Sequence, residues 1–373
     1  MKKQLLTAAI LCCFVIAGST AAPKSAKKKP KIPVSRVQTH MDGYLGDRID
    51  ACIRVRVCSE DPDLLVAPMR RQTETSLWQS EFWGKWTLGA IASYRYNKDP
   101  ELLRKIEGGV ESLLVTQQPD GYIGNYAPEA QLTNWDVWGR KYTMLGLLAY
   151  YDLTGDKKAL DGTVRLADHL LTQIPAVRQI ERTGIYRGMS SCSILEPIML
   201  LYNRTLDEKY LDFARYIVDR MESADGPQLI AKALDGVPVS ERFPLDDPSR
   251  GWFVWENGQK AYEMMSCYDG LLELYKVTND PRYLKAVEAT VTSIIADEIN
   301  IAGSGSSFEC FYKGKALQTE PAYHTMETCV TMTWMKLCYD LLRLTRNPLY
   351  ADQIERSAYN ALAASMKEDA SQI

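Results

Sequence analysis

A turn signal followed directly by a helix start recurs five times along this chain of 373 residues. In each case Asp or Asn precedes Pro, Lys or Glu, and an apolar run with the 3.6-residue period of a helix follows. The capping residues are Asp99, Asp156, Asp207, Asp280 and Asn347. An apolar helical segment also precedes each turn, at 86–96, 141–153, 194–203, 262–277 and 331–344. The pattern predicts five helical hairpins, each made of an inner helix, a short turn and an outer helix.

The spacing of the hairpins indicates the fold class. Successive capping residues lie 57, 51, 73 and 67 residues apart, which is long for a solenoid repeat of the tetratricopeptide type. Each interval leaves a long loop at the end opposite the tight turns, where functional residues tend to gather. We therefore expect an all-α fold, an (α/α)6 toroid with about five of its six hairpins present. On this interpretation the chain is a C-terminally truncated form of a longer protein.

The N-terminal segment has the pattern of an export signal. Lys2 and Lys3 precede an apolar stretch that is short for a membrane span, and small residues end the segment. We assign residues 1–22 to a signal peptide, 23–36 to a basic disordered linker and 37–373 to an incomplete catalytic barrel. A periplasmic or secreted protein without a membrane span is expected. The formal charge of −3 gives no indication of nucleic-acid binding.

Seven cysteines remain after the predicted signal peptide, and their odd number and spacing match no disulfide framework. One of them belongs to the motif Glu327-Thr328-Cys329, which begins a predicted inner helix. A carboxylate and a thiol two residues apart are both possible zinc ligands, and the helix N-terminus would lower the pKa of the thiol. The alternative is structural: a first-turn carboxylate beside a buried core thiol. A zinc site needs about four ligands, so this motif offers half of one.

Two loops carry further candidates. The Gly/Ser-rich segment 303–309 ends at Glu309, between two Phe residues. Apolar surroundings favour a protonated carboxyl, which suits a general acid, although an ordinary exposed glutamate fits the same pattern. The segment 117–122 contains a Pro-Asp-Gly turn followed by Tyr122, which could face a sugar or could simply close a loop between hairpins.

These three motifs, in their order along the chain, resemble the β-L-arabinofuranosidases of glycoside hydrolase family 127 and their relatives in family 146 and the domain-of-unknown-function 1680 group. The resemblance runs from about residue 40 to 366, and its most specific part is the Glu-x-Cys element. It implies a retaining glycosidase with a zinc-bound cysteine nucleophile, acting on pectic plant cell-wall oligo- or polysaccharides. By this resemblance Glu327 and Cys329 are zinc ligands. Glu309 is the acid/base by the same resemblance, although the interval between it and the motif is two residues longer than in the family.

The chain departs from the family pattern in two ways. The family uses a vicinal cysteine pair, whose first member is the nucleophile, and the only adjacent cysteines here lie inside the signal segment. We therefore expect this chain to be inactive alone. Lys141 and Lys260, with Arg140 beside the first, take positions where relatives commonly have His, and lysine point charges favour an anionic group. We therefore expect the substrate to carry an acidic, pentose-like sugar.

Two alternatives remain open. Another α/α-toroid enzyme, such as an unsaturated uronyl hydrolase or a sugar epimerase, would use carboxylates or histidines and no zinc. A non-catalytic glycan-binding fragment would use the same cleft without a nucleophile. Metal analysis distinguishes the first of these alternatives from the zinc-dependent glycosidase.

Overall fold

The computed structural model describes residues 39–243, 259–320 and 326–367. The predicted signal peptide and linker lie outside this part of the chain. The helices are α1 (Gly43–Cys52), α2 (Pro62–Arg71), α3 (Glu81–Asn97), α4 (Pro100–Val115), α5 (Asp136–Thr154), α6 (Lys157–Gln173), α7 (Met189–Cys192), α8 (Leu195–Thr205), α9 (Glu208–Met221), α10 (Leu229–Leu234), α11 (Ala261–Thr278), α12 (Pro281–Asp297), α13 (Thr328–Thr345) and α14 (Pro348–Ser357). Two short strands, β1 (Gln259–Lys260) and β2 (Cys310–Phe311), accompany them.

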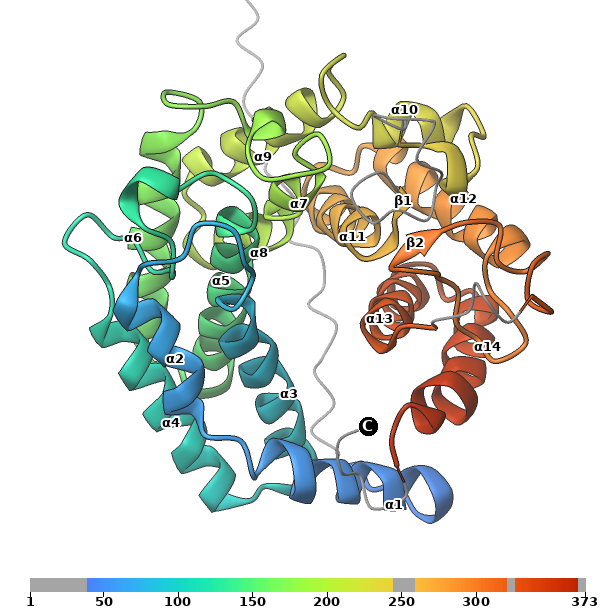
Figure 1. Cartoon of the computed structure of the whole chain (residues 1–373), viewed down its shortest axis with the longest axis horizontal. Helices are drawn as coiled ribbons and strands as arrows, with labels where there is room; N and C mark the ends of the chain where they lie inside the picture. Colours follow the sequence, from blue (N-terminus) through green and yellow to red (C-terminus); the bar gives the residue numbers. More distant parts are fainter. Residues whose placement is uncertain (1–38, 244–258, 321–325, 368–373) are drawn as a thin grey trace, which may run out of the picture. The chain divides into compact units, whose positions relative to one another are not determined.

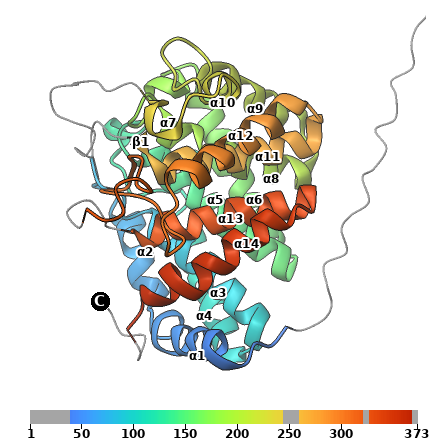
Figure 2. The same ribbon diagram turned by 90° about the vertical axis from the view of Figure 1, so that its right-hand side faces the viewer.

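The five predicted hairpins are present. They pair α3 with α4, α5 with α6, α8 with α9, α11 with α12, and α13 with α14. The first member of each pair packs against the first member of the next, so that α3, α5, α8, α11 and α13 follow one another as inner helices (Figure 1). Figure 2 shows α13 and α14 lying side by side. This is the α/α-toroid arrangement expected from the sequence, with five hairpins among the described residues.

Each hairpin turn consists of two residues, the first in the left-handed conformation and the second extended. The last residue of the turn is the predicted Asp or Asn, whose side chain accepts a hydrogen bond from the amide two positions on. The residue before it has the left-handed conformation that ends the inner helix. One of these five left-handed positions is Gly155 and another is Asn279, which adopt this conformation readily, but Lys98, Leu206 and Arg346 bear some backbone strain; at Leu206 φ is +56°.

Two features differ from the sequence analysis. Helices α3 and α5 begin five residues earlier than predicted, at Glu81 and Asp136, and most residues of these first turns are buried against neighbouring elements. A sixth capped turn, at Asp61 and Pro62, begins α2 and was missed. Asp61 accepts a hydrogen bond from the amide of Asp63, as the other five caps do with theirs.

Inner helices α3 and α5 cross closely because glycines lie at the crossing. A Cβ atom at Gly84 would come within 2.2 Å of the Tyr142 carbonyl oxygen, and one at Gly146 within 2.7 Å of the Trp83 ring. Only residues without a side chain allow this approach. No helix among the described residues is long and apolar enough to cross a membrane.

The candidate active site

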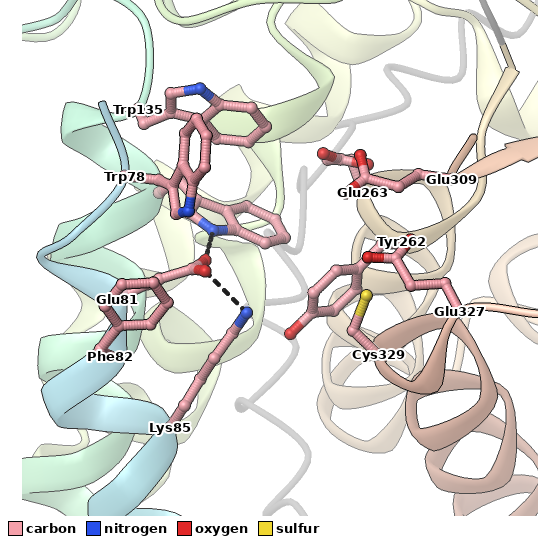
Figure 3. A pocket seen from close by; sticks show the side chains of 11 residues that line it. Trp78, Glu81, Phe82, Lys85, Trp135, Tyr262, Glu263, Glu309, Glu327 and Cys329 are labelled. Carbon is pink, nitrogen blue, oxygen red and sulfur yellow. Dashed lines mark hydrogen bonds and ion pairs between the residues drawn. The ribbon is translucent and has the colours of Figure 1, made fainter. Parts of the chain in front are cut away.

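A pocket of about 370 Å³ opens between α3 and α13, a size typical of small-molecule sites (Figure 3). Its lining residues come from two separate stretches of the sequence, 78–138 and 262–329. They are Trp78, Glu81, Phe82, Lys85, Trp135, Trp138, Tyr262, Glu263, Glu309, Glu327 and Cys329. The three residues predicted to carry the chemistry, Glu309, Glu327 and Cys329, therefore lie together on one side of the same pocket.

Glu309 reaches the pocket from a tight two-residue turn. Ser307 and Cys310 exchange backbone hydrogen bonds of 3.0 and 2.8 Å around Phe308 and Glu309. Both central residues have positive φ, +47° and +64°, as a type I′ hairpin turn requires. Such turns favour Asn-Gly, so a Phe-Glu pair is strained, and strain of this kind concentrates at functional sites. The adjacent strand pairing, Lys260 opposite Cys310, holds the turn against the start of α11.

Lys260 does not offer a free charge to the pocket. Its side chain is fully buried and forms an ion pair with the Glu309 carboxylate. The Glu309 carboxylate thus faces an ammonium group. We expected an apolar environment for it, but Phe308 is half exposed. Lys260 was expected to bind substrate; in the structure its buried amine pairs with the Glu309 carboxylate instead.

Glu327 and Cys329 meet at the first turn of α13. Glu327 is the N-cap residue, and its carboxylate hydrogen-bonds the Cys329 thiol. Burial and the neighbouring carboxylate raise the pKa of Cys329 well above its ordinary value. The pKa was predicted to be lowered by the helix terminus; it is raised instead, because desolvation and the Glu327 charge outweigh the helix dipole.

Glu327 and Cys329 offer two of the roughly four ligands that a zinc ion needs. One carboxylate oxygen of Glu327 is buried without a hydrogen-bond partner in the described part of the chain. A buried orphan oxygen beside a thiol is a donor set that zinc accepts. Within residues 39–243, 259–320 and 326–367, however, no three His, Cys, Asp or Glu side chains group closely enough to hold a metal ion. The two predicted ligands fit, and the described chain supplies no third.

The opposite wall of the pocket was missed by the sequence analysis. Glu81 is buried and accepts hydrogen bonds from the Lys85 amine, at 2.8 Å, and from the Trp138 indole. The Lys85 amine also lies 4.8 Å from the centre of the Tyr262 ring. Burial lowers the pKa of Lys85, but Tyr262 and Glu81 outweigh it and leave that pKa raised. The available signal was a Glu-Lys pair four residues apart in a tryptophan-rich stretch.

The remaining predicted substrate contacts lie outside this pocket. Tyr122 is buried and donates a 2.8 Å hydrogen bond to Asp136. Arg140 is fully buried and pairs with the same carboxylate at 2.6 Å. Both residues therefore help to anchor the start of α5, where they cannot contact a ligand in this pocket.

Lys141 is also buried, 4.3 Å from the centre of the Trp138 ring. Burial lowers the pKa of Lys141 to about 8, although Glu196 and Asp269 nearby raise it. Lys141 thus supports the aromatic wall from behind, and its charge is offset by carboxylates of other inner helices.

Comparison with known proteins gives a family match over most of the chain. A family model described as "Beta-L-arabinofuranosidase, GH127 catalytic domain" matches residues 37–373. The non-reducing end beta-L-arabinofuranosidase of Bifidobacterium longum subsp. longum is 22% identical over 314 residues, which cover 77% of this chain and 46% of that protein.

Solved structures show the same fold. A GH127 beta-L-arabinofuranosidase from Geobacillus stearothermophilus T6 superposes with a TM-score of 0.65 at 19% identity, covering 89% of this chain and 57% of the other. A second GH127 beta-arabinofuranosidase gives a TM-score of 0.64 at 20% identity, covering 89% and 54%. The chain thus spans about half the length of these relatives. Since the family model covers almost all of the sequence, the chain belongs to the GH127 β-L-arabinofuranosidase catalytic-domain family.

Proposed function

We propose that this chain forms the sugar-binding pocket, and carries the acid/base, of an exported retaining glycosidase that removes β-L-arabinofuranosyl units from pectic plant cell-wall glycans. The observation that carries the proposal is the convergence of Glu309, Glu327 and Cys329 on one pocket. An aromatic wall faces them. Family membership supports the reaction class.

In this mechanism Glu309 protonates the glycosidic oxygen as the bond to the leaving group breaks. A cysteine thiolate attacks the anomeric carbon and forms the covalent intermediate. Glu309 then accepts a proton from the water that releases the sugar. Lys260 keeps the carboxylate aimed into the pocket and offsets its charge after proton transfer.

Glu327 and Cys329 would hold the zinc ion. Bound zinc keeps thiol ligands deprotonated at neutral pH. The nucleophile and the further ligands are proposed to come from outside the described residues, because the sequence has no adjacent cysteine pair after the predicted signal segment. We accordingly propose that the 373-residue chain binds sugar without hydrolysing it.

The charges of the pocket favour a neutral sugar over the acidic one expected from the sequence. Four lining side chains are carboxylates, Glu81, Glu263, Glu309 and Glu327, whereas Lys85 is the one lining amine among the described residues. Lys141 and Lys260, on which the acidic expectation rested, already have carboxylate neighbours. A sugar carboxylate would enter a site of its own charge.

Two measurements test the proposal. In calorimetric titration, methyl β-L-arabinofuranoside should bind, and a carboxylated analogue should bind at least about tenfold more weakly. In competition with a chromophoric chelator, Cys329→Ser should lose zinc affinity, while Cys52→Ser, a half-buried cysteine of α1, should not. Equal zinc affinity of the two variants would refute the metal assignment. Tighter binding of the carboxylated sugar would restore the acidic expectation.

A further inference from the structure

The entrance of the pocket carries exposed apolar side chains that the proposed chemistry leaves without a role. Trp78 and Phe82 are 40% and 42% exposed, and both line the pocket. Leu77, beside them in sequence, is similarly exposed. Large apolar side chains gathered at the mouth of a polar site indicate a surface that something covers.

Trp78 is the outermost member of a ladder of aromatic rings. Its ring centre lies 6.3 Å from that of Trp135, at 73°, and Trp135 lies 5.8 Å from Trp138, at 68°. Trp138 in turn meets Tyr262 at 5.2 Å. Exposure falls from 40% at Trp78 to 7% at Trp135 and 2% at Trp138. The ladder therefore runs from the entrance to the interior, and edge-to-face contacts fix each ring.

The loop that presents Trp78 is held in place by hydrogen bonds. The Glu74 carboxylate accepts from the amides of Thr75, Ser76 and Leu77, at 2.8, 2.8 and 2.9 Å. The Tyr126 hydroxyl donates to the Leu77 carbonyl at 3.0 Å. A large exposed ring on an ordered loop can bind a ligand at little cost in conformational entropy.

The position of Trp78 suggests what it binds. Figure 3 shows Trp78 and Trp135 on the wall opposite Glu309 and Glu263. If Glu309 protonates the glycosidic oxygen, the leaving group must extend from Glu309 toward the open end of the pocket. A sugar ring presents a face of C–H groups, which packs against the flat face of an aromatic ring.

We propose that Trp78, supported by Trp135, is a stacking platform for the second sugar of the substrate, on the leaving-group side of the bond that is cut. This inference rests on the proposed glycosidase function. It predicts that the pocket distinguishes a disaccharide from a simple glycoside of the same terminal sugar.

The experiment compares two ligands by calorimetry: methyl β-L-arabinofuranoside, and a disaccharide in which a second L-arabinose replaces the methyl group. The unmutated chain should bind the disaccharide about tenfold more tightly than it binds the methyl glycoside. Trp78→Ala should lose this advantage while its affinity for the methyl glycoside stays within about twofold. Trp78→Phe should keep most of the advantage. Tyr339→Ala, at an exposed aromatic residue of α13 outside the pocket, should behave as the intact chain.

The outcomes separate the platform from the function on which it rests. If the intact chain binds both ligands equally, or if Trp78→Ala keeps the disaccharide advantage, the platform is refuted and the glycosidase proposal stands. If Trp78→Ala loses both ligands alike, Trp78 shapes the main pocket and the platform is again refuted. If the intact chain binds neither ligand, both proposals fail. Circular dichroism of each variant confirms that it folds.

Discussion

Replacing Gly84 with Ala tests whether the close crossing of α3 and α5 builds the aromatic wall of the pocket. The new Cβ atom would lie 2.2 Å from the Tyr142 carbonyl oxygen and 2.8 Å from the Tyr142 Cβ. The obstacle is helix backbone, which cannot rotate away as a flexible side chain can. The two helices must therefore separate by about 1 Å.

The magnitude follows from two opposing terms. Alanine is favoured over glycine in a helix by about 1 kcal/mol. Overpacking a tight interior contact costs about 1–3 kcal/mol, and a contact with rigid backbone belongs at the upper end. The net expectation for Gly84→Ala is a loss of about 1–2 kcal/mol in the free energy of unfolding. Because the Trp138 indole donates to Glu81 across this crossing, sugar affinity should fall as well.

Gly89→Ala is the matched control on the same helix. A Cβ atom there meets nothing within 4 Å, so only the gain in helix propensity remains, about 0.5–1 kcal/mol of stabilisation. Urea unfolding followed by tryptophan fluorescence measures both variants, and calorimetry with methyl β-L-arabinofuranoside measures binding. The reasoning fails if Gly84→Ala is as stable as the parent chain, or if the two variants change stability in the same direction.

Three further predictions use other parts of the fold. Leu206→Gly should raise stability by about 1 kcal/mol in thermal unfolding, because this exposed residue has φ +56°; no gain would mean that its backbone is unstrained. Burial raises the pKa of Asp269 from 3.8 to about 7, although Lys336, at 2.9 Å, lowers it. The native state therefore binds this proton more tightly than the unfolded chain does, and the free energy of unfolding falls as the pH rises from about 4 to about 7. Lys336→Met should steepen that fall, seen as a larger stability difference between pH 5 and pH 8; an unchanged slope would contradict it. In a double-mutant cycle, Lys260→Met and Glu309→Gln together should cost less stability than the sum of the single variants, by roughly 1 kcal/mol, and strict additivity would show that the pair does not interact.

The sequence predicted the hairpins well because their signals are local. The side chain of Asp280, for instance, accepts its hydrogen bond from an amide only two residues away. The spacing of Glu327 and Cys329 is local in the same sense, and the structure brings their side chains into contact. The starts of α3 and α5 were predicted too late, since burial against other elements decides them.

The aromatic wall could not be predicted in this way. Trp78, Glu81 and Lys85 lie more than 200 residues before Glu309, and no local pattern connects them. Tyr122 and Arg140 are the opposite case: their residue types suited a sugar site, and packing buried them around Asp136.

The five hairpins and their capping residues could be predicted from sequence alone, because they depend on helix periodicity and on hydrogen bonds between near neighbours. Which charges line the pocket depends instead on packing in three dimensions. That packing pairs Lys260 with Glu309, raises the pKa of Cys329 and sets Trp78 at the entrance of the pocket. Burial and ion pairing depend on side chains that are distant in the chain, and only the packing of the inner helices brings them together.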